Sequence, residues 1–243
     1  MQHFFECGAE VRHIGSMITV VIPTLNEAAY LVRCFNSLLQ ATMSGIVREV
    51  IVSDGGSADE TLLIADAAGA HVVSASRSRG AQLAKGAEIA RGDWLLFLHA
   101  NTVLEPGWEA EALAFMERTS IEWPCAAAFR LGLDDFSSRA RRIETFVGLR
   151  SRFFALPYGD QGLLIPARLY RKLGGFKPVA RMEDVDFARR LGRSRLVHLR
   201  ARAITDAARF RKENYFRRSL RSLGILFLCA LRVPTPLLAR LSS

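Results

Sequence analysis

Apolar runs that end in polar loops alternate, along the first half of the chain, with segments whose apolar residues recur at helical spacing. The runs are short and rich in β-branched residues, which is typical of strands buried on both faces of a sheet. The expected strands are 17–22, 49–53, 71–73 and 94–98, and the expected helices are 28–40, one ending at Ala68, one that contains Gln82, Lys85 and Glu88, and 106–118. This alternation predicts an α/β domain with a mostly parallel central sheet flanked by helices.

The second half of the chain is less regular. Its expected strands are 125–133 and 163–165, and its expected helices are a short one ending at Gly174 and one over 181–191. Residues 213–232 read as a long amphipathic helix, which Pro234 ends. The expected division is therefore a disordered tail over 1–16, one domain over 17–212, and a C-terminal amphipathic helix with a tail over 213–243.

The run Trp94–Leu98 ends abruptly in polar residues. His99 and Asn101 are one pleat apart, so a continued strand would point both side chains the same way. Ligands of open α/β sheets bind beyond the carboxyl ends of the strands, which makes this spot a candidate for holding a metal, a phosphate or a sugar. In the alternative interpretation, Asn101 and Thr102 belong to a surface turn and cap the helix that follows.

Three other polar residues occupy similar places. Asp54 follows an expected strand and can accept hydrogen bonds from a base or ribose, although an aspartate before two glycines is also typical of a turn. Arg79 precedes an expected helix, where a phosphate can bind. Asp184 stands at the start of the 181–191 helix, where it is either a functional carboxylate or a cap that suits the helix dipole.

The charge balance narrows the choice of partners. Lys and Arg number 33 against 24 Asp and Glu, a net charge of +9, which suits an anionic substrate, a membrane surface or nucleic acid. We expect no nucleic-acid partner, since no aromatic-interleaved basic motif or zinc-finger spacing is present. The first loop has no G-x-G-x-x-G, which disfavours a dinucleotide-dependent oxidoreductase. The four cysteines lack paired spacing and 1–16 lack a secretory signal, so a reducing, cytoplasmic location is expected.

Five motifs, in this order, resemble those of the inverting glycosyltransferases of family 2, which have the nucleotide-sugar-binding GT-A fold. They are Pro23-Thr24-Leu25-Asn26-Glu27, Asp54-Gly55-Gly56-Ser57, the polar end of Trp94–Thr102, Gly159-Asp160-Gln161-Gly162 and Glu183-Asp184. A narrower likeness, to the compact branch associated with arsenosugar biosynthesis, lies in Arg150-Ser151-Arg152, Tyr158–Gly162 and Met182–Asp186. The resemblance implies a GT-A-like single domain with a nucleotide-binding half over about 17–104 and an acceptor half over about 105–212.

The resemblance also implies a role for each matching residue. The donor, a nucleotide sugar and first of all a UDP-sugar, would be bound by Pro23, Glu27, Asp54, Gly55, Arg79 and His99. Glu27 and Asp54 would hold its ribose and base, and Arg79 would lie along its diphosphate. Asp160, Gln161 and Arg150 would bind an acceptor hydroxyl compound, either a small molecule or a lipid-linked one. Glu183 and Asp184 would be catalytic, with Asp184 as the general base.

Asn101 departs from the family pattern, which has a metal-binding aspartate at this place. An amide oxygen can bind Mn²⁺ or Mg²⁺ but lacks the negative charge of a carboxylate. In one interpretation the cation binds weakly, helped by Asp93 or His99; in a second, arginines such as Arg79 or Arg209 replace it. In a third, the protein binds the nucleotide sugar with little or no transferase activity. We expect metal-assisted transfer with a lowered metal affinity.

The 213–232 helix suggests a further contact. Basic and apolar residues alternate along it, and a basic amphipathic helix can lie on an anionic membrane. That would place the protein peripherally at the inner face of the membrane, within reach of a lipid-linked acceptor. The alternative is that the helix packs against its own domain or against the partner in a homodimer.

Overall fold

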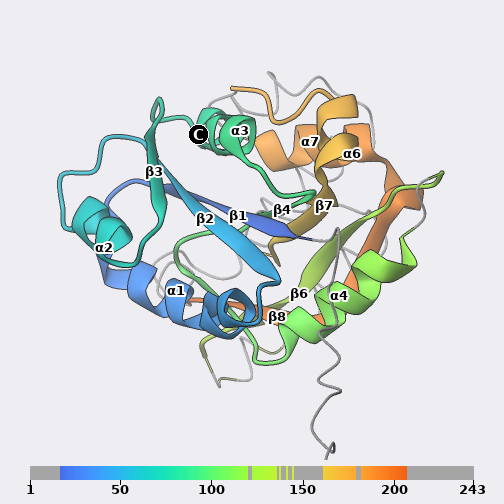
Figure 1. The fold of residues 1–243 in the computed structure, drawn as a ribbon, viewed down its shortest axis with the longest axis horizontal. Coiled ribbons are helices and arrows are strands. Elements are labelled where there is room, and N and C mark those ends of the chain that lie inside the picture. The colour runs from blue at the N-terminus through green and yellow to red at the C-terminus, as the bar shows by residue number, and fades with distance from the viewer. Residues whose placement is uncertain are drawn as a thin grey trace, which may run out of the picture.

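The computed structural model describes residues 17–119, 122–135, 137, 141, 144, 161–178 and 182–206 of the chain. Within these ranges strands and helices alternate much as the apolar pattern predicts (Figure 1). The strands are β1 Ile18–Thr24, β2 Val47–Asp54, β3 His71–Ser74, β4 Trp94–Phe97, β5 Thr102–Leu104, β6 Ala126–Leu133, β7 Leu163–Pro166 and β8 Leu196–Thr205. The helices are α1 Ala28–Met43, α2 Thr61–Ala67, α3 Arg79–Ile89, α4 Trp108–Arg118, α6 Ala167–Lys172 and α7 Glu183–Leu191, with a 3₁₀ turn, η2, at Arg193–Arg195.

The strands form one eight-stranded sheet in the order β3-β2-β1-β4-β7-β6-β8-β5. The strands β3, β2, β1 and β4 are parallel, because a helix returns the chain to the same end of the sheet before each new strand. β7 is antiparallel to both β4 and β6, so β4 and β6 run in the same direction. β8 is parallel to β6, and β5 pairs antiparallel with β8. The carboxyl ends of β1, β2, β4 and β8 therefore lie at one rim of the sheet.

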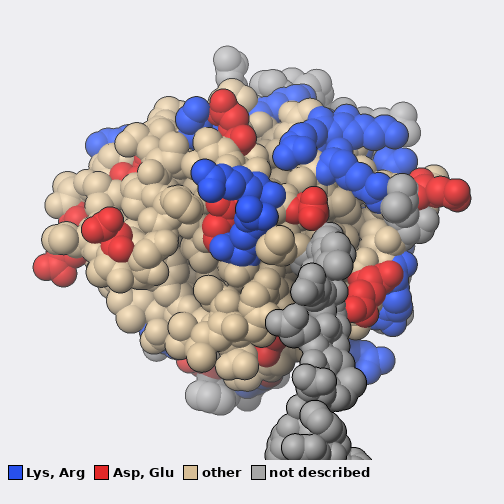
Figure 2. Space-filling model, viewed as in Figure 1, with Lys and Arg blue, Asp and Glu red and all other residues tan. Residues whose placement is uncertain are grey.

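Basic side chains are spread unevenly over the surface. Figure 2 shows Lys and Arg gathered over α6 and α7. The last turn of α6 carries Arg171 and Lys172, and that of α7 carries Arg189 and Arg190. Cations at the end of a helix interact favourably with its negative carboxyl terminus, so part of the positive charge has a structural use.

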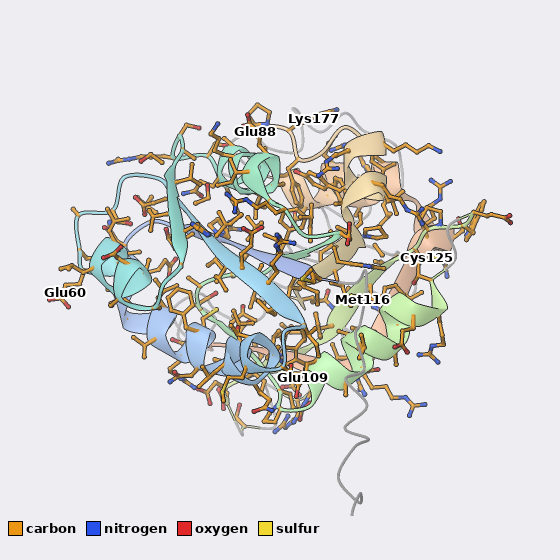
Figure 3. The ribbon with its side chains drawn as sticks, in the orientation of Figure 1. Glu60, Glu88, Glu109, Met116, Cys125 and Lys177 are labelled. Atoms are coloured by element: carbon orange, nitrogen blue, oxygen red, sulfur yellow. The ribbon has the colours of Figure 1, made fainter. Side chains whose placement is uncertain are left out.

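The helices lie in two layers, one on each face of the sheet. α1 and α4 pack on one face, while α3, α6 and α7 pack on the other. Figure 3 shows Lys177 on the α3 side of the molecule and Glu109 and Met116 on the α4 side. Side chains of β1 alternate between the layers, so that Val20 packs in the α1–α4 core and Val21 in the α3–α7 core.

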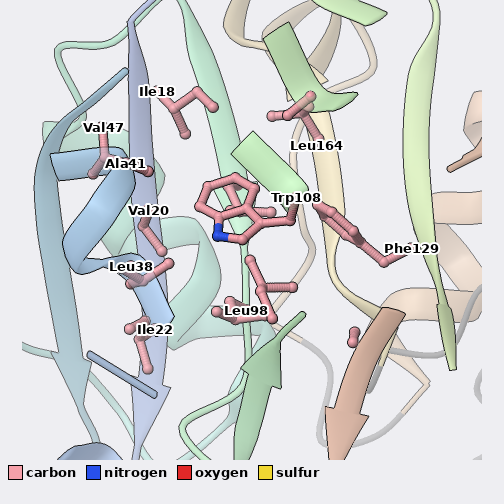
Figure 4. Close-up of a cluster of buried hydrophobic side chains, with 14 of the residues drawn as sticks. Ile18, Val20, Ile22, Leu38, Ala41, Val47, Leu98, Trp108, Phe129 and Leu164 are labelled. Atoms are coloured by element: carbon pink, nitrogen blue, oxygen red, sulfur yellow. The ribbon is translucent and has the colours of Figure 1, made fainter. Parts of the chain in front are cut away.

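Trp108, the first residue of α4, fills the centre of the α1–α4 core (Figure 4). Its ring centroid lies 6.1 Å from that of Phe129, and its indole N–H donates to the carbonyl oxygen of Ser37 at 3.0 Å. Burying a large apolar side chain stabilises a fold by roughly 1.5–3 kcal/mol. This core therefore holds α1 and α4 firmly against the sheet.

The structure confirms the α/β class and the mostly parallel sheet, and it adds two strands that the apolar pattern did not predict. β5 is short, and β8 carries His198, Arg200 and Arg202 between its apolar residues, so neither forms an apolar run. The tails expected over 1–16 and 213–243 lie outside the described residues. Within the described ranges, no helix combines the length and apolar character that a bilayer-spanning segment needs.

Candidate active site

The loops that follow β1 and β2 lie side by side at the carboxyl rim of the sheet. Asn26 adopts a left-handed backbone conformation (φ 57°), which Asn tolerates better than most residues. Its N–H donates to Ser57 Oγ at 2.9 Å, and its Oδ1 accepts from the Ala58 N–H at 2.8 Å. The N–H of Glu27, just before α1, donates to Thr61 Oγ1 at 2.9 Å. These bonds join the two loops into one polar shelf.

Asp54, the last residue of β2, organises this shelf. It is buried, and its carboxylate accepts hydrogen bonds from the hydroxyls of Thr24 (2.9 Å) and Ser57 (2.5 Å) and from the N–H groups of Gly56 and Ser57 (both 2.8 Å). Burial disfavours the charged form, but the hydrogen bonds outweigh it, so the pKa of Asp54 lies below its ordinary value. Since a carboxylate has about four acceptor positions, Thr24 and the loop after β2 occupy all of them. Asp54 therefore acts on a ligand through the loop that it shapes.

We expect Asp54→Asn to lower the free energy of unfolding by about 1–3 kcal/mol at pH 7, because the amide leaves buried donors without an acceptor. The pKa of Asp54 is lowered in the fold, so its stabilising effect is present above the unfolded pKa of about 3.9 and is lost as the pH falls through the folded pKa. Urea unfolding at pH 7 and pH 3 should therefore show the variant approaching the wild type in acid. Asp66→Asn, at an exposed position on α2, is the control. An equal deficit at both pH values would contradict this role.

Gln82 joins helix α3 to the same shelf. This buried side chain donates from Nε2 to the carbonyl oxygen of Thr24 at 2.7 Å, which also accepts the N–H of Gly55 at 2.9 Å. A Cβ on Gly55 would lie 2.5 Å from Gln82 Nε2, so only glycine fits there without a shift of the amide. The first turn of α3 is thus held against the end of β1 and the loop that follows β2.

The same end of α3 packs against the start of α7. A Cβ on Gly80 would lie 2.1 Å from the carbonyl oxygen of Lys177 and 3.2 Å from Glu183 Cβ. Arg79 Nη1 lies 3.7 Å from Glu183 Oε1, in an ion pair whose arginine is largely exposed and whose carboxylate is buried. Burial and the neighbouring Asp184 carboxylate raise the pKa of Glu183, and Arg79 opposes them. Helix α3 therefore connects the Asp54 loop to the Glu183-Asp184 pair.

A cavity of about 490 Å³, including the part open to solvent, lies between α3, α7 and the sheet. We call it the α3–α7 cavity. Its wall is mostly apolar, with Leu83, Phe97, Phe176, Phe187 and Leu191, and its polar members are His99, Glu183 and Asp184. Glu183 and Asp184 join this wall at the start of α7, and a carboxylate beside a bound hydroxyl group can act as its general base.

Asn101 lines a different cavity from His99, so the expectation that their side chains point the same way is wrong. β4 ends at Phe97, and the turn over residues 98–101 breaks the alternation of β4 before Asn101. Asn101 lines a cavity of about 240 Å³, including the part open to solvent, between α1 and the end of β8, here called the α1–β8 cavity. Asp93 stands before β4, about 13 Å along the strand from its other end, so it cannot share a metal site with Asn101.

The other candidate residues divide into two groups. Pro23 is buried on β1 beside Ser53 of β2, and Gln161 is buried with its Nε2 donating to the carbonyl oxygen of Phe129 at 3.1 Å. Gln161 thus braces β6 next to the turn at Gly162. Arg150, Asp160 and Arg209 lie outside the described residues.

Two residues near the site were not among the predicted ones. Gln82 is a polar residue at a position where the helical pattern predicts an apolar one. This departure from the pattern could have marked Gln82 as a candidate site residue. Asp206 follows β8 directly and faces the α1–β8 cavity. The sequence could have pointed to Asp206 through the alternation of Val197, Leu199, Ala201 and Ala203 with polar residues. This alternation indicates a strand that ends just before Asp206.

Comparison with known proteins shows which family this chain resembles. A family model described as "Glycosyl transferase family 2" matches residues 19–172. The chain is 37% identical over 105 residues to a PGL/p-HBAD biosynthesis glycosyltransferase of Mycobacterium bovis, an alignment that covers 40% of this chain and 39% of that protein. It is 32% identical over 103 residues to the glucosyl-3-phosphoglycerate synthase of Mycobacterium tuberculosis, covering 39% and 32%. The chain thus aligns with less than half the length of these relatives.

Among solved structures, a crystal structure of that synthase in complex with Mn²⁺ and UDP-glucose resembles this fold. The superposition has a TM-score of 0.63 at 21% identity and covers 90% of this chain and 80% of the synthase chain. The likeness confirms the GT-A-type single-domain fold.

Proposed function

Because the chain belongs to glycosyl transferase family 2, we propose that it transfers a sugar from a nucleotide-sugar donor to an acceptor hydroxyl with inversion at the anomeric carbon. The observation that carries the proposal is the position of Asp184 in the wall of the α3–α7 cavity, with the Asp54 loop joined to the same helix α3 through Gln82. Donor and acceptor would meet beside the first turn of α3.

The donor would bind on the shelf after β1 and β2. Asp54 would hold the loop in the shape that receives the nucleoside, Glu27 would accept from its ribose, and Arg79 would lie along the diphosphate. The Arg79 side chain is exposed, and its distance of 3.7 Å from Glu183 is long for an ion pair. The guanidinium group can therefore turn toward a bound anion. The complex of the glucosyl-3-phosphoglycerate synthase with UDP-glucose supports a UDP-sugar as the donor.

Asp184 would act as the general base. The acceptor oxygen attacks the anomeric carbon while the bond from that carbon to the diphosphate oxygen breaks, and the hydroxyl proton passes to the Asp184 carboxylate. Attack and departure occur on opposite faces, so the configuration inverts without a covalent intermediate. A divalent cation, Mn²⁺ or Mg²⁺, would neutralise charge on the departing diphosphate when bound. Asn101 and its neighbours would hold it.

The acceptor would occupy the α3–α7 cavity. Its apolar wall favours a hydroxyl compound that carries an apolar part, whether a small molecule or the end of a lipid. The narrower likeness to the arsenosugar-biosynthesis branch is part of this proposal and rests on the sequence motifs alone.

A thermal-shift panel of nucleoside diphosphates and nucleotide sugars, with and without Mn²⁺, tests the donor. A ligand at 100 times its Kd stabilises by about 2.7 kcal/mol, which raises the Tm of a domain of this size by roughly 5–10 °C. We expect this shift for UDP and a UDP-sugar. No shift with any nucleotide would refute the proposal, whereas binding without transfer or donor hydrolysis would favour the alternative that Asn101 suggests, a nucleotide-sugar-binding protein.

A further inference from the structure

The α1–β8 cavity brings together two residues that are far apart in the sequence. β5 and β8 pair antiparallel with Thr102 opposite Thr205 and Val103 opposite Ile204. One step outward along the same register, Asn101 stands opposite Asp206, and the Asp206 N–H donates to the Asn101 carbonyl oxygen at 3.4 Å. Residues opposite each other in an antiparallel pair lie on the same face, which is why Asn101, Val103, Ile204 and Asp206 all line this cavity.

The Asn101 side chain is poised for a ligand. It is about nine-tenths buried and lines the cavity, yet its amide makes no hydrogen bond with the residues that the structure describes. An amide that is largely enclosed and lines a cavity is placed to meet a ligand that enters it. Asn101 and Asp206 follow the carboxyl ends of β4 and β8, at the same rim of the sheet as the donor shelf.

An amide oxygen beside a carboxylate is a donor set that hard divalent cations accept. Among the described residues, no group of three or more His, Cys, Asp or Glu side chains is placed to hold a metal without other ligands. A cation here would therefore need further oxygens, such as those of a diphosphate. The cavity also holds Asp134, which pairs with Arg33 at 3.1 Å.

We propose that Asp206 supplies the carboxylate for the divalent cation in this chain, with the Asn101 amide oxygen as its neighbouring ligand. The negative charge that position 101 lacks is provided from the opposite strand. This inference rests on the proposed function, because the donor diphosphate completes the metal site.

The test measures Mn²⁺ affinity rather than activity, from the electron paramagnetic resonance signal of free Mn²⁺ titrated with protein and UDP. We expect Asp206→Asn to weaken UDP-dependent Mn²⁺ binding by at least about tenfold. Asn101→Asp should tighten it, and the double variant Asn101→Asp with Asp206→Asn, which moves the charge across the strand pair, should return to within a few-fold of the wild type. Asp134→Asn, in the same cavity, is the matched control and should change the affinity less than Asp206→Asn.

Several outcomes would overturn the inference. Unchanged Mn²⁺ affinity in Asp206→Asn, or a double variant no better than Asp206→Asn, would remove Asp206 from the metal site. If Mn²⁺ does not change the affinity for UDP, this inference is wrong but the proposed function is not contradicted. If the protein does not bind UDP at all, both are refuted. Asp206→Ser, tested beside a thermal unfolding curve, separates loss of the ligand from loss of the fold.

Discussion

Asp184→Asn is expected to lower sugar transfer by about 10²–10⁴-fold while donor binding persists. A positioned carboxylate contributes about this factor by removing the proton of a hydroxyl nucleophile, and an amide cannot accept that proton. Asp184 lies in the wall of the α3–α7 cavity, in the first turn of α7, and its Oδ1 accepts the Val185 N–H at 2.8 Å. An asparagine can keep this local bond, so the backbone should be undisturbed. Steady-state transfer and UDP titration of the same preparation measure the two effects.

Asp186→Asn is the matched control for this substitution. It removes one acid from the same helical turn, but Asp186 pairs with Arg190 at 2.7 Å and is not part of the cavity wall. Both variants weaken the favourable interaction with the helix dipole, so only a base in the cavity predicts a large difference between them. Equal transfer rates in the two variants, or turnover of Asp184→Asn near the wild-type level, would exclude Asp184 as the base.

Gly80→Ala is expected to lower transfer on the order of 10²-fold. The added Cβ would lie 2.1 Å from the carbonyl oxygen of Lys177, so the segment around Lys177 and the start of α7 must move by about 1 Å. A displacement of this size at a reacting group costs about that factor. Alanine is favoured over glycine inside a helix by about 1 kcal/mol, so helix propensity cannot account for a loss. The rate of transfer should fall more than the affinity for UDP, because the Asp54 loop is held separately through Gln82.

Glu88→Ala serves as the control on the same helix. It raises helix propensity at an exposed position and removes only a surface ion pair with Lys85. We expect this variant to transfer at the wild-type rate. A Gly80→Ala protein with unaltered transfer would show that the contact between α3 and α7 does not position the catalytic pair.

The repetitive part of the fold could be predicted from the sequence because its strands are apolar on both faces. β1, β2 and β4 are such runs, and the helices between them have one apolar face. β8 escaped prediction because it lies toward the edge of the sheet and alternates apolar residues with His198, Arg200 and Arg202. Local apolar content is a weak signal for a strand with only one buried face.

The candidate site was predictable only as a set of residue types. Asp54, Asn101 and Asp184 each lie at or next to the end of an element, and that much is visible in the sequence. Which of these residues lie together could not be predicted, because that depends on the face of the sheet toward which each turn directs its side chains. The structure joins Asp54 to Glu183-Asp184 through α3 and separates Asn101 into the α1–β8 cavity.

The sequence by itself determined the α/β class, the positions of the central strands along the chain and the polar residues at their ends, because hydrophobic periodicity and turn chemistry are local properties. Only the tertiary structure decided which of those residues meet. The pairing of β5 with β8 sets Asp206 opposite Asn101, and the close approach at Gly80 sets α7 against α3. Both depend on contacts between segments roughly a hundred residues apart, which no local pattern records.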